Sequence, residues 1–206
     1  MIKAIKLKKI VVFVIILVII FGILYYKNFL FGNNISKNRN NHQTEEILKS
    51  MENYCAEIEV SVNSNKTVNQ YKIYQEVKQN YSMQEIKEGS DIEGVKIELE
   101  ANRLKVSNAK LKLEKVYENY SSLLNHAMFL NTFSQDYKNE ANISNEFEEN
   151  GELILEVKLN TSPNTYIQYK KLHVDTKTKK PIKLEIKDNT KKETICILYN
   201  NIELKK

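Results

Sequence analysis

The residues of this chain that are best suited to chemistry lie between Leu172 and Asp188, in the segment LHVDTKTKKPIKLEIKD. In an extended strand His173 and Asp175 point to the same side, so their spacing allows a histidine–carboxylate hydrogen bond of the kind used in general base catalysis. No nucleophile accompanies the pair in the sequence. A hairpin accounts for the same residues more simply, because Pro181 then opens an alternating strand, where its missing N–H costs no ladder hydrogen bond. We therefore favour the hairpin over an active site.

No other segment carries a recognised catalytic or metal-binding set. The remaining histidines, His42 and His126, have no partner at metal-ligand spacing, and the sequence lacks a G-x-S-x-G, a Cys-x-x-Cys and a glycine-rich phosphate loop. Glu148 and Glu149 would serve a glycosidase only if two such acids converged on one cleft, and their polar surroundings favour solvated charges. The sequence therefore predicts a non-enzymatic protein with no metal and no cofactor.

A membrane anchor is the most specific prediction from the N-terminal residues. Four lysines among the first nine residues precede 17 residues without a charge, which would span ~25 Å as a helix. This run is longer than the apolar part of a signal peptide, no small-x-small cleavage site follows it, and no cysteine near its end offers a lipid attachment site. An uncleaved anchor is thus favoured over a cleaved signal peptide. The predicted anchor residues are Ile10, Val11, Val12, Phe13, Val14, Ile15, Ile16, Leu17, Val18, Ile19, Ile20, Phe21, Gly22, Ile23, Leu24, Tyr25 and Tyr26.

The lysines also predict the orientation of this single-pass anchor. Because four precede the apolar run and only Lys27 follows it closely, we expect the N-terminus on the cytoplasmic side of the cytoplasmic membrane and the C-terminal domain on the outer side.

Residues 1–32 hold five lysines and no acid, so the rest of the chain has 26 basic and 26 acidic residues. A neutral domain makes nucleic acid a poor partner.

Outside the cytoplasm a disulfide between Cys55 and Cys196 is permitted, but their spacing in the sequence does not decide whether the two thiols meet.

We expect four segments along the chain: a cytoplasmic N-terminus at 1–9, the transmembrane anchor at 10–30, a polar linker at 31–43 and an extracytoplasmic domain at 44–206. Thr44 has the residue type and the following acids of a helix N-cap, so a short helix should open the domain there.

Most of the domain alternates apolar and polar residues with a period of two, which is typical of half-buried strands. Residues expected on the buried face include Ile58, Val60, Leu111 and Leu113, and Asn150-Gly151 is a strong hairpin signal. About ten short strands and two helices predict an α+β fold: a curved antiparallel sheet that is covered by one or two helices and preceded by the N-terminal transmembrane helix.

The second predicted helix, residues 121–137, has an apolar stripe at helical spacing that would cover a face of the sheet. Within the stripe, Leu123, Met128 and Phe133 are possible lining residues for an apolar cavity that holds a lipid. The same side chains would equally well fill the core, and the sequence leaves both alternatives open.

The C-terminal strands resemble those of LolA-like lipoprotein-carrier domains. The resemblance rests on the order of strand, Thr/Lys turn, proline, alternating strand, Asp-Asn turn and closing strand, that is, on Leu172, Val174, Asp175, Thr178, Pro181, Ile186, Asp188, Ile195, Ile197 and Tyr199. The element order upstream, from Tyr54 to Tyr71 and through the helix that ends at Tyr137, also matches. This combination is most similar to the clostridial germination lipoproteins of the GerS type, here with a transmembrane anchor in place of the lipid-bearing cysteine.

The resemblance implies an open half-barrel of LolA-like fold at residues 44–206 and a membrane-tethered protein of a spore-former. It also implies a protein partner, a cell-wall amidase, and a role in the peptidoglycan modification of the spore cortex that germination requires. A lipid or lipoprotein carrier, or a sensor that uses the LolA-like cavity, is the alternative. The partner interface and the oligomeric state stay open, because no motif marks them.

Overall fold

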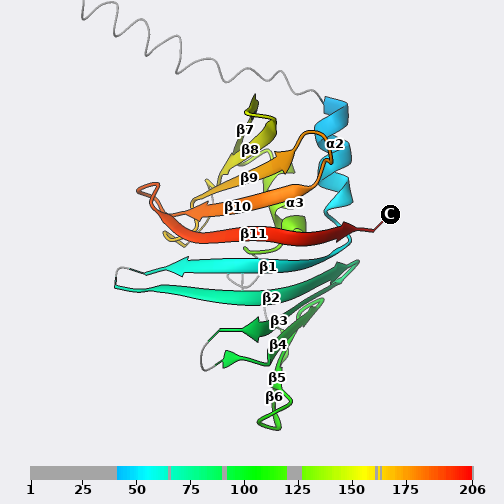
Figure 1. Cartoon of the computed structure of the whole chain (residues 1–206), viewed down its shortest axis with the longest axis vertical. Coiled ribbons are helices and arrows are strands. Elements are labelled where there is room, and N and C mark those ends of the chain that lie inside the picture. The colour runs from blue at the N-terminus through cyan, green and yellow to red at the C-terminus, as the bar shows by residue number, and fades with distance from the viewer. Residues whose placement is uncertain are drawn as a thin grey trace, which may run out of the picture. The chain divides into compact units, whose positions relative to one another are not determined.

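An antiparallel sheet of eleven strands dominates the structure, which is a computed structural model (Figure 1). The strands are β1 (Tyr54–Asn63), β2 (Val68–Lys78), β3 (Tyr81–Glu88), β4 (Val95–Glu100), β5 (Arg103–Asn108), β6 (Leu113–Tyr117), β7 (Ile143–Glu149), β8 (Glu152–Lys158), β9 (Tyr169–Asp175), β10 (Pro181–Lys187) and β11 (Glu193–Leu204). In the described part of the chain two helices, α2 (Asn41–Ser50) and α3 (Leu130–Lys138), accompany the sheet. The predicted class, an antiparallel sheet with one or two helices, is confirmed.

The structure describes residues 41–64, 66–89, 92–119, 127–160, 162 and 164–205. All of them belong to one unit of the chain, Asn40–Lys206. The predicted anchor at 10–30 and most of the predicted linker lie outside the described residues, as do Leu123 and His126. Across the described ranges, no helix has the length and apolar character needed to cross a membrane.

The strand order β6-β5-β4-β3-β2-β1-β11-β10-β9-β8-β7 divides the sheet into two meanders. Every pair of neighbouring strands is consecutive in the chain, except β1 and β11, which join the meanders in the middle from Tyr54↔Leu204 to Val62↔Ile195. Strands β6 and β7 are the two edges and do not pair with each other, so the sheet is open.

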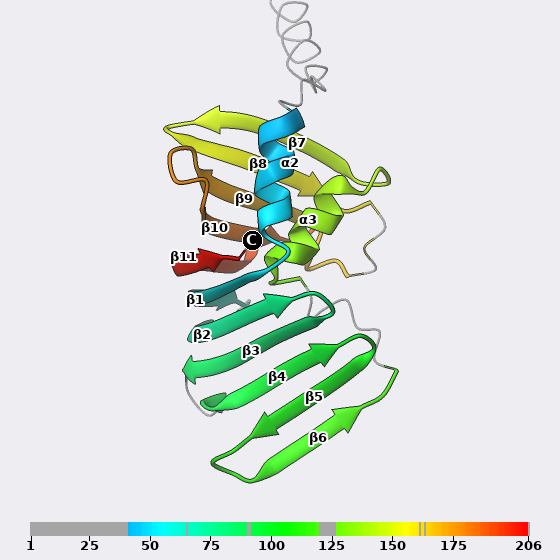
Figure 2. The same ribbon diagram turned by 90° about the vertical axis from the view of Figure 1, so that its right-hand side faces the viewer.

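Period-two patterning places one face of the sheet in the core, as predicted. On β1 the side chains of Tyr54, Ala56, Ile58 and Val60 are buried, while Glu57 and Glu59 between them are exposed. Figure 2 shows α2 and α3 against the β7–β11 part of the sheet, whereas β3–β6 extend beyond both helices. The face toward the helices is called the inner face below, and the opposite face the outer face.

Helix α2 starts at Asn41 and not at Thr44, so the predicted N-cap is wrong. Thr44 lies inside the helix and is buried, and its hydroxyl donates a hydrogen bond of 2.9 Å to Glu146 Oε2 on β7. The tertiary partner on β7 therefore replaces the local capping bond that the residue type suggested. The expected apolar face of the helix is correct, because Ile47, Leu48 and Met51 are buried.

Helix α3 begins at Leu130, later than the helix predicted at 121–137, because Phe129 before it has an extended backbone. Ala127 and Met128 lie in a turn before it. The predicted stripe nevertheless packs on the sheet: Phe133 and Tyr137 are buried, and their rings stack with centroids 6.0 Å apart.

Two turns lie where the sequence predicts them. Asn150-Gly151 joins β7 and β8 with φ of 52° and 82°, the left-handed values of a two-residue hairpin turn, and Ala101 lies in the turn between β4 and β5 with φ 51°.

The prediction that Leu111 and Leu113 are buried is wrong, since they are 62% and 63% exposed. Alternation marks a face of β6 but does not reveal that β6 is an edge strand beyond the helices.

The two cysteines are free thiols. Cys55 pairs across the sheet with Glu203, and Cys196 pairs with Ser61, six residues further along β1. Six residues of a strand span ~20 Å, well beyond the ~7 Å between Cα atoms that a disulfide tolerates. The register of β1 and β11 therefore keeps the two cysteines too far apart to form a disulfide.

Candidate functional site

The structure separates the two residues of the candidate catalytic pair. Asp175 Oδ1 accepts hydrogen bonds from the backbone N–H groups of Lys177 (3.1 Å) and Thr178 (2.6 Å), and the bond from Thr178 in particular holds the pKa of Asp175 below its usual range. His173 instead contacts Glu152 on β8, with 2.7 Å between Nδ1 and Oε2. Asp175 is therefore a turn residue, and the hairpin of β9 and β10 is confirmed.

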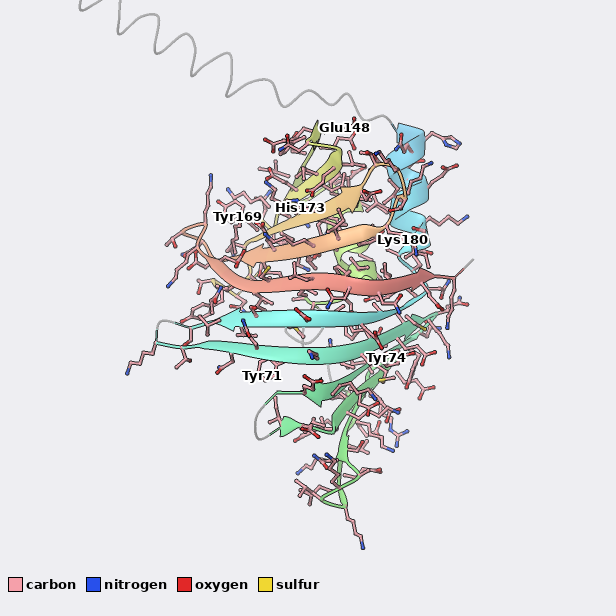
Figure 3. All side chains as sticks on the ribbon, viewed as in Figure 1. Tyr71, Tyr74, Glu148, Tyr169, His173 and Lys180 are labelled. Carbon is pink, nitrogen blue, oxygen red and sulfur yellow. The ribbon has the colours of Figure 1, made fainter. Side chains whose placement is uncertain are left out.

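His173 belongs to a charged network on the outer face of the sheet (Figure 3). Its Nε2 lies 3.5 Å from Glu185 Oε1, outside hydrogen-bonding geometry. The two oxygens of Glu185 each lie 2.6 Å from a lysine Nζ, of Lys183 and Lys187 respectively. The nearby Glu185 carboxylate, followed by Glu152, raises the pKa of His173 against the opposing effect of burial. In turn His173, and then the two lysines, lower the pKa of Glu185 strongly.

The contacts in this network are charge pairs. Within the described ranges, no three His, Cys, Asp or Glu side chains come together as metal ligands do. Sequence reasoning missed Glu152 and Glu185 as partners of His173, because they are distant in sequence and meet only through the pairing of β8, β9 and β10.

We expect the network to make stability depend on pH through His173. A raised pKa in the folded state means that the stabilisation is complete below the ordinary histidine pKa of about 6.5 and is lost as pH rises through the folded value. His173→Gln should lower the free energy of unfolding by about 1.5 kcal/mol at pH 6, and the difference from the wild type should shrink by pH 9. Urea unfolding at a series of pH values measures this, with His42→Gln, at an exposed position of α2, as the control. A difference that is constant with pH would show that His173 contributes only packing.

The inner face carries polar contacts that fix the helices. Lys170 on β9 is 1% exposed at its side chain, and its Nζ donates a 2.6 Å hydrogen bond to Asp136 Oδ2 on α3. Burial lowers the pKa of Lys170, and Asp136 opposes that effect. The Tyr54 hydroxyl donates to Gln75 Oε1 at 3.0 Å and accepts from the N–H of Leu130, the first residue of α3, at 3.2 Å. The strands thus hold α3 by both ends.

The sequence held a signal for this buried ion pair that the prediction did not use. Side chains alternate along β9, so Lys170 points to the same face as Leu172 and Val174, which both point inward. A lysine on the inner face needs a buried partner for its charge.

The proposed cavity residues lie in different environments. Phe133 is completely buried in the core, and Met128 is half-buried against it, while Leu123 lies outside the described residues. Their role as the lining of a lipid cavity stays a prediction.

A patch of exposed apolar side chains lies at the β6 edge. Leu113 and Tyr117, four residues apart on the same side of β6, are 63% and 44% exposed, and Leu111 in the preceding turn is 62% exposed. Among the described strands, β6 pairs with β5 alone, so no described strand covers the backbone groups on its other side. Exposed apolar groups beside an open edge are typical of a protein interaction surface. We call this set, with β6, the β6 edge.

The described part of the chain is thus an open antiparallel sheet that carries its helices on one face. The family model for the sporulation protein YdcC-like family matches residues 7–206, and the chain belongs to this family. No curated protein sequence matches the chain significantly.

Several solved structures are similar to this protein. The structure of the CwlD amidase from Clostridioides difficile in complex with the GerS lipoprotein contains GerS, which is 22% identical to this protein, with a TM-score of 0.52 over 82% of this chain and 97% of that chain. An uncharacterized conserved protein from Thermus thermophilus has 9% identity and a TM-score of 0.49, covering 80% and 88% of the two chains. The LolA superfamily protein NE2245 from Nitrosomonas europaea has 12% identity and a TM-score of 0.40, covering 79% and 93%. The resemblance to LolA-like and GerS-type proteins is confirmed, and at these identities the structural likeness concerns the fold.

Proposed function

We propose that this protein is a membrane-anchored, non-enzymatic partner of a cell-wall amidase, acting outside the cytoplasmic membrane in spore cortex modification and germination. The observation that carries the proposal is the likeness to GerS, which extends over 97% of that chain and which comes from a complex of GerS with an amidase. Membership in a sporulation family agrees with it. The lysines before the apolar run favour an N-terminus in the cytoplasm and a C-terminal domain on the side of the membrane that faces the peptidoglycan.

The β6 edge is the surface on which we expect the amidase to dock. It combines free backbone groups with the exposed side chains of Leu113 and Tyr117, so a partner strand can add to the sheet and also bury apolar area. The opposite edge, β7, also has exposed apolar side chains, Ile143 and Phe147. A lysine ammonium lies 5.5 Å from an aromatic ring centroid at each edge, so this contact does not distinguish them. The β6 edge is preferred because its apolar side chains are more exposed, at 63% and 44% against 45% and 36% at β7.

Co-purification from sporulating cells tests the proposal. Full-length protein in detergent should retain a cell-wall amidase, and Leu113→Asp should reduce the recovered amidase about tenfold, because a carboxylate would be desolvated in the interface. Ile143→Asp at the β7 edge is the matched control and should retain the amidase. Deletion of the gene should lower the lactam content of the spore cortex.

Failure to recover any amidase, together with normal cortex lactam in the deletion strain, would refute the partner function. Equal recovery with Leu113→Asp and the wild type would refute only the docking surface. The lipid or lipoprotein carrier is the second candidate function, for which the LolA-like fold is the supporting feature. The two functions differ in the effect expected of Phe133→Ala on stability and on bound lipid.

A further inference from the structure

A cavity of about 310 Å³ opens at the β7–β10 end of the sheet, remote in the strand order from the β6 edge. Its lining includes one acid, Glu156, and several lysines, together with an aromatic ring and an exposed aliphatic side chain. Among the lining residues are Ile143, Glu156, Lys158, Tyr169, Lys187 and Lys191. We call this cavity the lysine pocket.

The strand register explains why the lysines gather there. Ile143 pairs with Lys158, Lys158 pairs with Tyr169, and Tyr169 pairs with Lys187, so these four residues form one row across β7, β8, β9 and β10. The row places a lysine on each side of the Tyr169 ring. From the turn between β10 and β11, Lys191 adds a third, with its Nζ 5.7 Å from the centroid of that ring. Figure 3 shows Tyr169 at the end of β9, beside this turn.

Little negative charge offsets these lysines. Glu156 lies 3.4 Å from Lys171, and Glu185 lies 2.6 Å from Lys187, so each carboxylate already has a lysine of its own. Lys158 and Lys191 make no ion pair with a carboxylate among the described residues, and both are exposed. Lysine ammonium groups bind phosphate as point charges, and two of them here are available for a ligand.

A second cavity provides an internal comparison. It lies at β1, β2 and the end of β3, and its charged lining consists of Glu59, Glu88 and Lys72. Lys72 is paired with Glu88 at 2.7 Å. Since residues 33–206 carry equal numbers of basic and acidic residues, the concentration of lysines in the lysine pocket is local and is not a consequence of overall charge.

We propose that the lysine pocket binds a phosphate-bearing ligand about as large as a sugar phosphate. The phosphate would lie between the Nζ atoms of Lys158 and Lys191, with Lys187 beside it. The neutral part would contact the Tyr169 ring and the exposed side chain of Ile143, which is 45% exposed. The volume is at the lower end of the range of ligand sites, about 300–1,000 Å³, so it suits one sugar unit and not an acyl chain.

Titration calorimetry of the full-length protein in a neutral detergent tests this proposal. Glucose 6-phosphate should bind, glucose should not, and binding should weaken as the salt concentration is raised. The double variant Lys158→Met/Lys191→Met should weaken binding about tenfold or more, because two charge-assisted contacts are lost. The matched control, Lys66→Met/Lys112→Met, removes the same charge from exposed sites outside the pocket and should bind as the wild type does.

Three results would overturn the proposal: no binding of glucose 6-phosphate, equal binding of glucose, or equal weakening in the control variant. Inorganic phosphate and a soluble poly(glycerol phosphate) form two further arms that identify the source of the phosphate. Preference for the polymer assigns the pocket to a wall polymer, and preference for glucose 6-phosphate assigns it to a free metabolite. Unchanged far-UV circular dichroism of each variant shows that the loss is one of binding and not of folding.

Discussion

Replacing Asp136 by alanine is expected to lower the free energy of unfolding by about 3 kcal/mol. The change leaves the ammonium group of Lys170, 1% exposed at its side chain, without the carboxylate that lies 2.6 Å from it. Burial already lowers the pKa of Lys170, so the charged lysine depends on Asp136. The same contact joins α3 to β9, and its loss also loosens the helix from the sheet. Urea unfolding monitored by circular dichroism measures the effect.

Two control variants separate the buried charge from general damage. Lys170→Met combined with Asp136→Ala removes both charges and should recover most of the stability, because an apolar side chain of similar length then fills the interior. Glu156→Ala breaks the half-exposed pair with Lys171 on the outer face and should cost less than about 1 kcal/mol. Equal costs for Asp136→Ala and Glu156→Ala would contradict the importance of the buried pair.

Phe133→Ala is expected to cost about 3–5 kcal/mol of unfolding free energy, the range measured for buried aromatic residues. Phe133 is completely buried, and its ring stacks on Tyr137 in the layer between α3 and the sheet. If Phe133 fills the core, the truncation leaves a void that its neighbours only partly close. If it lines a lipid cavity, the cost falls below about 1 kcal/mol, because the space was never packed.

Native mass spectrometry of the full-length protein completes this experiment. The partner function predicts no bound lipid in the wild type and a large loss of stability in Phe133→Ala. The carrier function predicts a bound lipid whose occupancy changes in the variant, together with a small loss of stability. Tyr166→Ala, a truncation of an aromatic residue that is 66% exposed, is the matched control and should change neither measurement.

Much of the fold follows from local patterns. The alternation from Tyr54 to Val60 predicts β1 and its buried face, and Asn150-Gly151 predicts the hairpin of β7 and β8, because side-chain direction and turn geometry depend on neighbouring residues. Local rules failed where a distant partner decided the outcome. Thr44 contacts Glu146 in place of capping a helix, and Leu113 is exposed because β6 is an edge.

The candidate sites divide in the same way. The segment around His173 was correctly predicted as a hairpin, since the alternation and Pro181 are local features. Its network with Glu152 and Glu185, the buried pair of Lys170 with Asp136 and the row of lysines around Tyr169 were not predicted. Each of these depends on which distant strands or helices lie side by side, and local sequence patterns do not give that.

By itself the sequence determined the period of the strands, the turn between β7 and β8, the neutral charge of the domain and the resemblance to LolA-like and GerS-type proteins. Only the tertiary structure decided that β1 and β11 join two meanders, that β6 and β7 remain as edges, and which charges meet on each face. The physical reason is that the direction of a side chain depends on its own backbone. Its partners depend on a register that the whole sheet sets at once, through the burial of a shared core.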